Sequence, residues 1–237
     1  MKVENWKLFA ADPEDPHRKR MMQLANVPQR KWDASLALAH GSAADEVRTY
    51  LDDLRGNVER GDGMMLYGDY RVGKSCLAAC VLREVVAHRA RAYWLDASDL
   101  ADCWERRDDY FVTARSSHFL VIDDLGIEGY APFRKEMVGR ALRYRLERAM
   151  TTVVTTNMAP AELKDHYGPK VHALLREILG TPIEVKEWKG DSVKAAAAEK
   201  AAAEAEAAKG RRLAEQQARE KERTEKARLR IKGDRNG

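Results

Sequence analysis

MMLYGDYRVGKSCLAACV, residues 64–81, joins a short apolar run to a glycine-containing loop and then to a helical pattern. Within it, Gly68 to Ser75 fit the pattern GxxxxGK[ST] of a phosphate-binding loop, or P-loop. In such a loop, backbone N–H groups and the positive end of the following helix surround a phosphate group. The residues predicted to bind the phosphates are Gly68, Asp69, Tyr70, Arg71, Val72, Gly73, Lys74, Ser75 and Cys76. Lys74 is expected to reach the β- and γ-phosphates, and the Ser75 hydroxyl to bind Mg²⁺.

Around this loop, short apolar runs alternate with longer helical patterns, which is typical of a parallel sheet covered by helices. The expected strands are 64–67, 92–95, 119–122, 151–155 and 183–188, and the expected helices are 74–88, 99–107, 132–149 and 169–179. Most of the strands are almost continuously apolar or β-branched, as strands buried on both faces require. The sequence therefore predicts an α/β fold.

Two further strands end in polar side chains. The run FLVIDD, residues 119–124, ends in two carboxylates, of which Asp123 is expected to hold Mg²⁺ and Asp124 to orient the attacking water. The run TTVVTTN, residues 151–157, ends in Asn157, which can bind that water or the γ-phosphate if its strand lies between the other two. The alternative for all three residues is that they only begin turns.

The composition excludes several classes of protein. The chain has 237 residues and a formal charge of +4, and it contains no apolar run of the length that crosses a membrane and no N-terminal export signal. A cytoplasmic location is therefore expected. The three cysteines, Cys76, Cys80 and Cys103, are too few for a disulfide framework and do not have zinc-site spacing.

Charge and composition divide the chain into three predicted parts: a short extension (1–24), a nucleotide-binding domain (25–194) and an Ala-rich, then basic tail (195–237). The tail carries 12 Lys and Arg against 8 Asp and Glu, which accounts for the net charge. Its residue types favour a helix, although it lacks a continuous apolar stripe. It is interpreted either as a solubilising or disordered extension, or as a basic arm for nucleic acid or a partner.

Two sets of residues are candidates for binding single-stranded DNA, which is held by basic groups and aromatic faces. The first set comprises Trp104, Arg106 and Arg107, followed by Tyr110 and Phe111. The alternative is that these aromatic side chains belong to the core. The second set lies on one predicted helix and comprises Arg140, Arg143, Arg145 and Arg148, which are spread around the helix. The alternative is that some of them face a neighbouring subunit.

The motifs together resemble DnaC-type helicase loaders and the related IstB-type transposase helper ATPases of the AAA+ superfamily. The resemblance covers residues 22–194 and is carried by ANVPQRKWDASL (25–36), GDYRVGKSCLAACV (68–81), FLVIDDLGIE (119–128), RKEMVGRALRYRLER (134–148), VVTTNM (153–158), HYGPKV (166–171) and WKGDSVK (188–194). It implies a five-stranded AAA+ sheet with a reduced or absent lid. It also implies ATP or ADP and Mg²⁺ as ligands, Walker A residues at Lys74 and Ser75, Walker B residues at Asp123 and Asp124, and sensor 1 at Asn157. The implied partners are a hexameric replicative helicase, single-stranded DNA and, with ATP, further copies of the chain.

Three positions depart from the family pattern. Arg71 replaces a third P-loop glycine, so a loop less able to adopt positive φ is expected. Leu174 stands where the family has its arginine finger, and Arg176, two residues on, is the candidate substitute. Lys194 replaces the sensor 2 arginine and keeps the charge without the bidentate fork. Slow hydrolysis, or hydrolysis that needs a partner's cation, is therefore expected.

The leading hypothesis is an ATP-dependent helicase loader, encoded by a phage or mobile element. The alternatives are a transposition helper that binds duplex DNA and a transposase, or an adaptor that binds nucleotide without hydrolysing it. Because a separate helicase-binding domain does not fit before residue 25, the helicase contact is expected in the tail or near Trp6, Leu8 and Phe9.

Overall fold

The computed structural model describes residues 16–36, 39–88, 90–106, 109–128 and 132–186. The chain divides into two compact units, Met1–Gly190 and Asp191–Gly237, and all the described residues belong to the first. The predicted tail and most of the predicted N-terminal extension lie outside the described residues.

The centre of the first unit is a five-stranded sheet in which every neighbouring pair is parallel. Its strands are β1 (Met64–Tyr67), β2 (Ala92–Asp96), β3 (Phe119–Leu125), β4 (Thr151–Thr156) and β5 (Ile183–Glu184), in the order β2-β3-β4-β1-β5. The predicted parallel five-stranded sheet is thus confirmed. Strand β5 is shorter than predicted, because it pairs only with Leu66 and Tyr67, after which β1 gives way to the P-loop.

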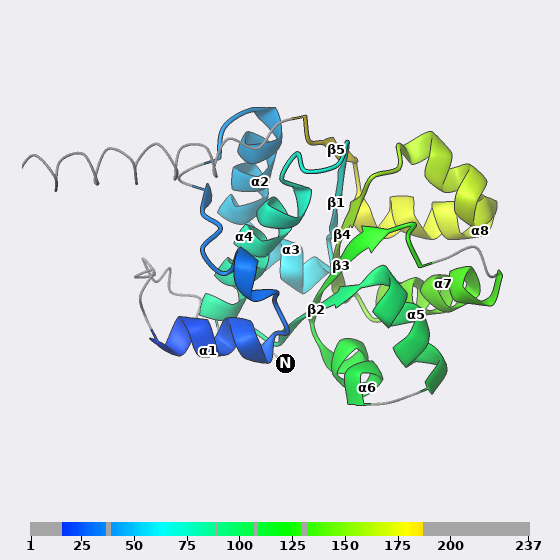
Figure 1. Cartoon of the computed structure of the whole chain (residues 1–237), viewed down its shortest axis with the longest axis horizontal. Coiled ribbons are helices and arrows are strands. Elements are labelled where there is room, and N and C mark those ends of the chain that lie inside the picture. The colour runs from blue at the N-terminus through cyan, green and yellow to red at the C-terminus, as the bar shows by residue number, and fades with distance from the viewer. Residues whose placement is uncertain (1–15, 37–38, 89, 107–108, 129–131, 187–237) are drawn as a thin grey trace, which may run out of the picture. The chain divides into compact units, whose positions relative to one another are not determined.

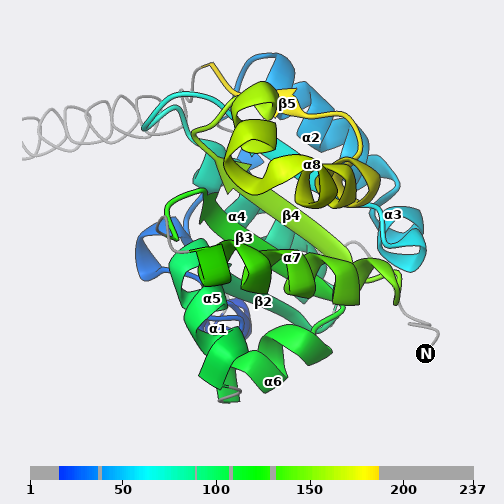
Figure 2. The same ribbon diagram turned by 90° about the vertical axis from the view of Figure 1, so that its right-hand side faces the viewer.

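Helices cover both faces of the sheet (Figures 1 and 2). One face carries α1 (Pro16–Leu24), η1 (Gln29–Lys31), α2 (Ser42–Asp52), α3 (Leu54–Arg60) and α4 (Lys74–Ala87). The other carries α5 (Ala97–Arg106), α6 (Asp109–Ser116), α7 (Pro132–Leu146) and α8 (Pro160–Leu179). The predicted helix 169–179 is confirmed: α8 consists of two helical segments separated by the non-helical Gly168 (φ 78°), and the second segment begins at Pro169. None of the described helices is long and apolar enough to cross a membrane.

Neighbouring residues of each central strand pack into different layers of core. Leu66 and Val121 contact the cluster that contains the buried face of α4, whereas Met65 and Leu120 contact the cluster beneath α7 and α8. This two-sided burial explains why the strands are almost continuously apolar, and it holds the carboxyl ends of β1, β3 and β4 in fixed positions.

Arg145 corrects the prediction of a basic DNA-binding set on α7, because its side chain is fully buried. Its guanidinium donates hydrogen bonds to the Thr152 hydroxyl (2.8 Å) and to the carbonyls of Ala114, Ser117 and Thr151 (2.7–3.0 Å). Burial lowers the pKa of Arg145 to about 9, which leaves the guanidinium charged at neutral pH. Arg145 therefore joins α6, α7 and β4 and is not available to DNA.

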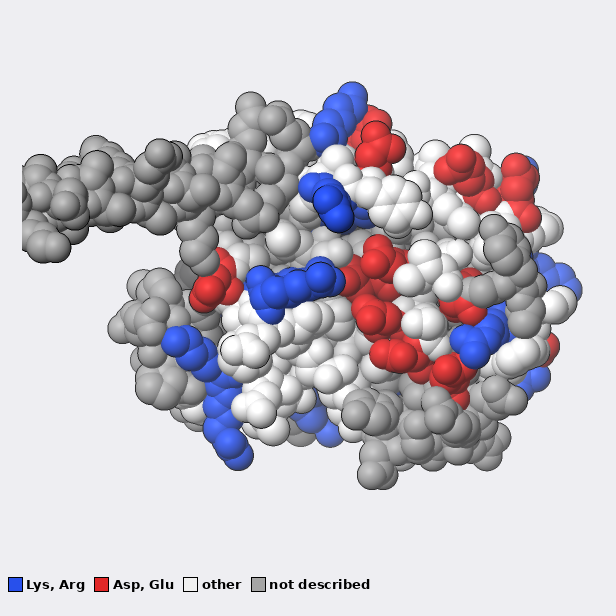
Figure 3. Space-filling view, viewed as in Figure 1, with Lys and Arg blue, Asp and Glu red and all other residues white. Residues whose placement is uncertain are grey.

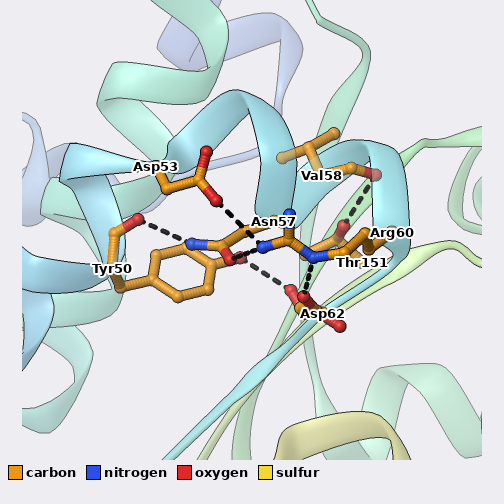
Figure 4. A network of polar contacts seen from close by, with 7 residues as sticks. All are labelled: Tyr50, Asp53, Asn57, Val58, Arg60, Asp62 and Thr151. Carbon is orange, nitrogen blue, oxygen red and sulfur yellow. Dashed lines mark hydrogen bonds and ion pairs between the residues drawn. The ribbon is translucent and has the colours of Figure 1, made fainter.

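A polar network fixes the chain just before β1 (Figure 4). Arg60 donates to the carboxylates of Asp62 (2.6 Å) and Asp53 (3.0 Å), and to the Asn57 amide oxygen (2.7 Å). The Tyr50 hydroxyl donates to the Asp62 carbonyl (2.8 Å). These contacts tie α2 and α3 to the turn that leads into β1, and β1 carries the P-loop at its other end.

Candidate functional site

The predicted motifs meet at one edge of the sheet. Gly68 follows β1, Asn157 follows β4, and Asp123 lies in β3, so the three come from neighbouring strands. Because the strands are parallel, their carboxyl ends share an edge, which is the usual position of a ligand site in such sheets. Near the middle of the molecule, where the sheet lies, acidic side chains gather with basic side chains directly beside them (Figure 3).

Lys74 is the centre of this site. It is the first residue of α4, and its side chain is buried, with 4% exposed. The ammonium group donates hydrogen bonds to the carbonyls of Gly68 (3.0 Å) and Asp69 (2.6 Å) and to Oδ1 of Asn157 (2.6 Å). The structure therefore brings the predicted Walker A lysine and the predicted sensor 1 amide into direct contact. A cavity of about 780 Å³ beside them is lined by Tyr70, Asn157 and other residues.

The P-loop backbone has the conformation that a phosphate cradle needs. Gly68 (φ 142°) and Gly73 (φ 97°) have dihedrals that favour glycine, and a Cβ on Gly68 would collide with the Val185 carbonyl. Arg71 also has positive φ (63°), although a loop less able to adopt this conformation was expected at this position. For a non-glycine residue this backbone costs about 1–2 kcal/mol, which the surrounding fold compensates.

A bulge near the end of β3 presents the two carboxylates. The β3–β4 pairing shifts register between Ile122 and Leu125, and Asp124 has a left-handed backbone (φ 54°). Thr155 on β4 holds this bulge, since its hydroxyl donates to Oδ1 of Asp123 (2.5 Å) and accepts from the Asp124 N–H (2.9 Å). Bulges commonly re-aim side chains next to functional sites. Thr155 was not among the predicted site residues.

Burial and the charges of the site shift the pKa values of two of its groups. Burial lowers the pKa of Lys74, although the carboxylates of Asp124, Asp123 and Asp69 oppose this effect. Partial burial and the neighbouring Asp123 carboxylate raise the pKa of Asp124, against the opposing effect of Lys74. A raised pKa is typical of a carboxylate that exchanges protons or hydrogen bonds with water. It is less typical of a carboxylate that only forms ion pairs.

The residues present fit a Mg²⁺ ion. Ser75, which is half-buried in the first turn of α4, offers a hydroxyl oxygen, and the buried Asp123 offers a carboxylate. Mg²⁺ prefers such oxygen ligands, retains several waters and is commonly shared with phosphate oxygens. Within the described ranges, no group of three or more His, Cys, Asp or Glu is arranged to hold a metal. The donor set therefore suits a metal that is bound together with phosphates.

Two predicted site residues, Arg176 and Lys194, lie elsewhere or outside the described residues. Leu174 is packed against the core beneath α8, and Arg176 is exposed and lines a separate cavity with Tyr67 and Pro160. Arg176 is therefore not part of the phosphate site of its own chain, and its role as a substitute finger remains a prediction. Lys194 lies outside the described residues.

Apart from the buried Arg145, the predicted DNA-binding residues also remain untested. Trp104 and Arg106 belong to α5, but their side chains are outside the described part of the structure, as is the whole of Arg107. On α7, Arg140 and Arg143 are exposed, and Arg140 pairs with Glu136 (2.7 Å).

Sequence reasoning missed one charged residue of the site. Lys31 lies in the stretch ANVPQRKW, residues 25–32, and is buried. Its ammonium lies 3.4 Å from Oδ2 of Asp123. The pairing joins segments far apart in the sequence, and no local pattern indicates it. A lysine among polar residues usually signals a solvated surface.

The sheet order, the P-loop and the strand-end carboxylates define a P-loop protein of the AAA+ type. No protein-family model matches the chain. The replicative helicase loader DnaI of Bacillus subtilis (strain 168) is 25% identical over 117 residues, which cover 46% of this chain and 37% of that protein. This chain thus spans little more than a third of that relative's length.

Solved structures agree with this similarity. The crystal structure of the DnaC helicase loader superimposes with a TM-score of 0.60 at 26% identity, covering 67% of this chain and all of the other. AMPPCP-bound DnaA from Aquifex aeolicus, at 16% identity and a TM-score of 0.50, shares the fold over 61% of this chain. Within the AAA+ class, the chain is thus similar to DnaC-type helicase loaders, and the resemblance predicted from the sequence is confirmed.

Proposed function

We propose that this chain binds ATP or ADP with Mg²⁺ and uses the nucleotide to control the loading of a replicative helicase onto single-stranded DNA. The observation that carries the proposal is the convergence of Lys74 and Asn157, whose side chains lie 2.6 Å apart beside the strand that bears Asp123 and Asp124. A lysine, a strand-end carboxylate pair and an amide at one sheet edge are the groups that phosphoryl transfer from a nucleotide requires.

Each group has a distinct role in the proposed reaction. The P-loop N–H groups and Lys74 bind and orient the phosphates. Ser75 and Asp123 would hold Mg²⁺, which would supply positive charge to offset the developing negative charge. Asp124 orients the attacking water, and Asn157 positions that water or the γ-phosphate. Leu174 is packed against the core and Arg176 lines another cavity, so neither position supplies a finger cation to the phosphate site of its own chain. Turnover by the isolated chain is therefore expected to be slow.

Replacing Asp124 by asparagine is expected to lower the ATP hydrolysis rate by about a hundredfold or more, with little change in ATP affinity. The amide retains the size of the side chain but cannot accept a proton from water. A coupled phosphate-release assay, run with helicase and DNA present, measures this loss. Since the pKa of Asp124 is raised, wild-type turnover should begin to fall on acidification at a higher pH than an ordinary aspartate would give.

The exposed Asp99 in the first turn of α5 provides the matched control, because Asp99→Asn removes a nearby charge outside the phosphate site. Asp99→Asn should hydrolyse ATP at close to the wild-type rate. Equal rates in the wild type and Asp124→Asn would rule out the role given to Asp124.

The helicase partner is supported by the similarity to DnaI and DnaC, and it is tested directly by co-purification with the host's replicative helicase. The full chain is expected to form a complex whose stability differs between ATP and ADP. Labelled single- and double-stranded DNA, titrated at two salt concentrations, should reveal a preference for single strands. No helicase complex with either nucleotide, together with a preference for duplex DNA, would instead favour a transposition helper.

A further inference from the structure

Lys31 places a second positive charge inside the site, on the opposite side of Asp123 from Thr155. The lysine ends η1 and is 7% exposed. Its ammonium lies 3.4 Å from Oδ2 of Asp123 and 5.3 Å from the centre of the Trp94 ring on β2. An ammonium held between a carboxylate and an aromatic face, away from water, interacts strongly with both.

The backbone around Lys31 fixes this position. The Trp94 N–H donates to the Ala25 carbonyl (2.8 Å), and the Asn26 amide donates to the Trp94 carbonyl (3.0 Å). The Trp32 indole donates to the Val27 carbonyl (2.8 Å). The turn that precedes η1 is therefore tied to Trp94 of β2 by one backbone hydrogen bond and by the Asn26 side chain, which holds the segment that carries Lys31 near Asp123.

The two oxygens of Asp123 consequently have different partners. Oδ1 accepts from Thr155 (2.5 Å), which is neutral and orients the carboxylate. Oδ2 faces Lys31, which neutralises its charge. A divalent cation binds this carboxylate through its negative charge, which Lys31 offsets. The Lys31 ammonium and the metal therefore compete for the Asp123 carboxylate.

We propose that Lys31 is a positioning residue that neutralises Asp123 and thereby sets the Mg²⁺ concentration at which the site takes up the metal. The proposal rests on the proposed nucleotide site and adds a tuning element to it. Lys31 acts through Asp123 and has no role in the chemical step. It makes metal uptake depend on phosphates that supply further negative charge, and so disfavours uptake of Mg²⁺ alone.

The deciding variants are Lys31→Gln, which removes the charge but keeps an N–H donor for Asp123, and Lys31→Arg, which keeps the charge. The exposed neighbour Arg30 gives the matched control, since Arg30→Gln removes the same charge from the adjacent residue, whose effect on the site is the smallest of the influences on the Asp124 carboxylate. The first readout is Mg²⁺-dependent thermal stabilisation of the full chain without nucleotide. The second is the half-saturating Mg²⁺ concentration for the fluorescence change of a labelled ADP.

Lys31→Gln is expected to lower the half-saturating Mg²⁺ concentration about tenfold, because a nearby opposite charge changes carboxylate affinity by at least this factor. It should also give a clear thermal stabilisation by Mg²⁺ alone. Lys31→Arg and Arg30→Gln are expected to stay within about twofold of the wild type. An unchanged Mg²⁺ response in Lys31→Gln, or an equal shift in Arg30→Gln, would overturn the proposal.

A measurement on the wild type keeps the proposal testable if Lys31→Gln does not fold. Amine acetylation read by mass spectrometry should modify Lys31 faster with ADP and Mg²⁺ than with ADP and a chelator, because the metal weakens its hold on Asp123. Equal rates would contradict the proposal. Labelled ADP that fails to bind even with Mg²⁺ would instead refute the nucleotide site itself, so the two failures are distinguishable.

Discussion

Replacing Lys74 by alanine is expected to abolish the thermal stabilisation that ADP and Mg²⁺ give the wild type. At an ADP concentration a hundred times the dissociation constant, binding adds about 2.7 kcal/mol, or roughly 5–10 °C for a chain of this size. The variant loses the only lysine that contacts both the P-loop carbonyls and Asn157 in the described structure. Affinity should fall at least about a hundredfold, since a charge-assisted contact to phosphate is lost.

Differential scanning fluorimetry with and without nucleotide makes this comparison within each variant, so any change in baseline stability cancels. Lys170→Ala, an exposed lysine on α8, is the matched control and should keep the full ADP shift. If ADP stabilised Lys74→Ala as much as the wild type, the ligand would be bound somewhere other than the P-loop.

Replacing Arg145 by methionine is expected to lower the free energy of unfolding by about 3–5 kcal/mol, or roughly 6–20 °C in melting temperature. The substitution keeps much of the side-chain length but leaves the carbonyls of Ala114, Ser117 and Thr151 buried without their donor. Urea denaturation followed by circular dichroism measures the loss.

The control for this prediction is Arg143→Met, two residues away on α7 and exposed. It should change stability by no more than about 0.5 kcal/mol. Similar stabilities of Arg143→Met and Arg145→Met would show that the buried guanidinium is dispensable.

The fold was predictable because its signals are local. Strands buried on both faces are continuously apolar. The P-loop is identified by the spacing of Gly68, Gly73, Lys74 and Ser75. Because the strands are parallel, Asp123 and Asn157 come to the same edge of the sheet. The sequence predicts that they meet at the P-loop only on the condition that β4 lies between β3 and β1. The sheet order confirms this condition.

The remaining features depend on contacts between distant segments. In the sequence, Lys31 and Arg145 both resemble solvated basic residues. In the structure each is buried against residues from other segments, which a local pattern does not identify. Arg71 adopts positive φ because the loop is fixed at both ends, by β1 and by α4, which overrides the preference of its side chain. Pro169 was correctly read as a helix start, because the non-helical backbone of Gly168 separates the two segments of α8, whereas the segment before Gly168 was not predicted.

The central claim is that a nucleotide binds at the turn that ends in Lys74. Isothermal titration calorimetry of ADP into the full chain with Mg²⁺ tests it most directly. One binding site per chain in the wild type, and none in Lys74→Ala, is the predicted result. An absence of binding heat in the wild type across a range of temperatures, or the same isotherm in both proteins, would contradict the claim.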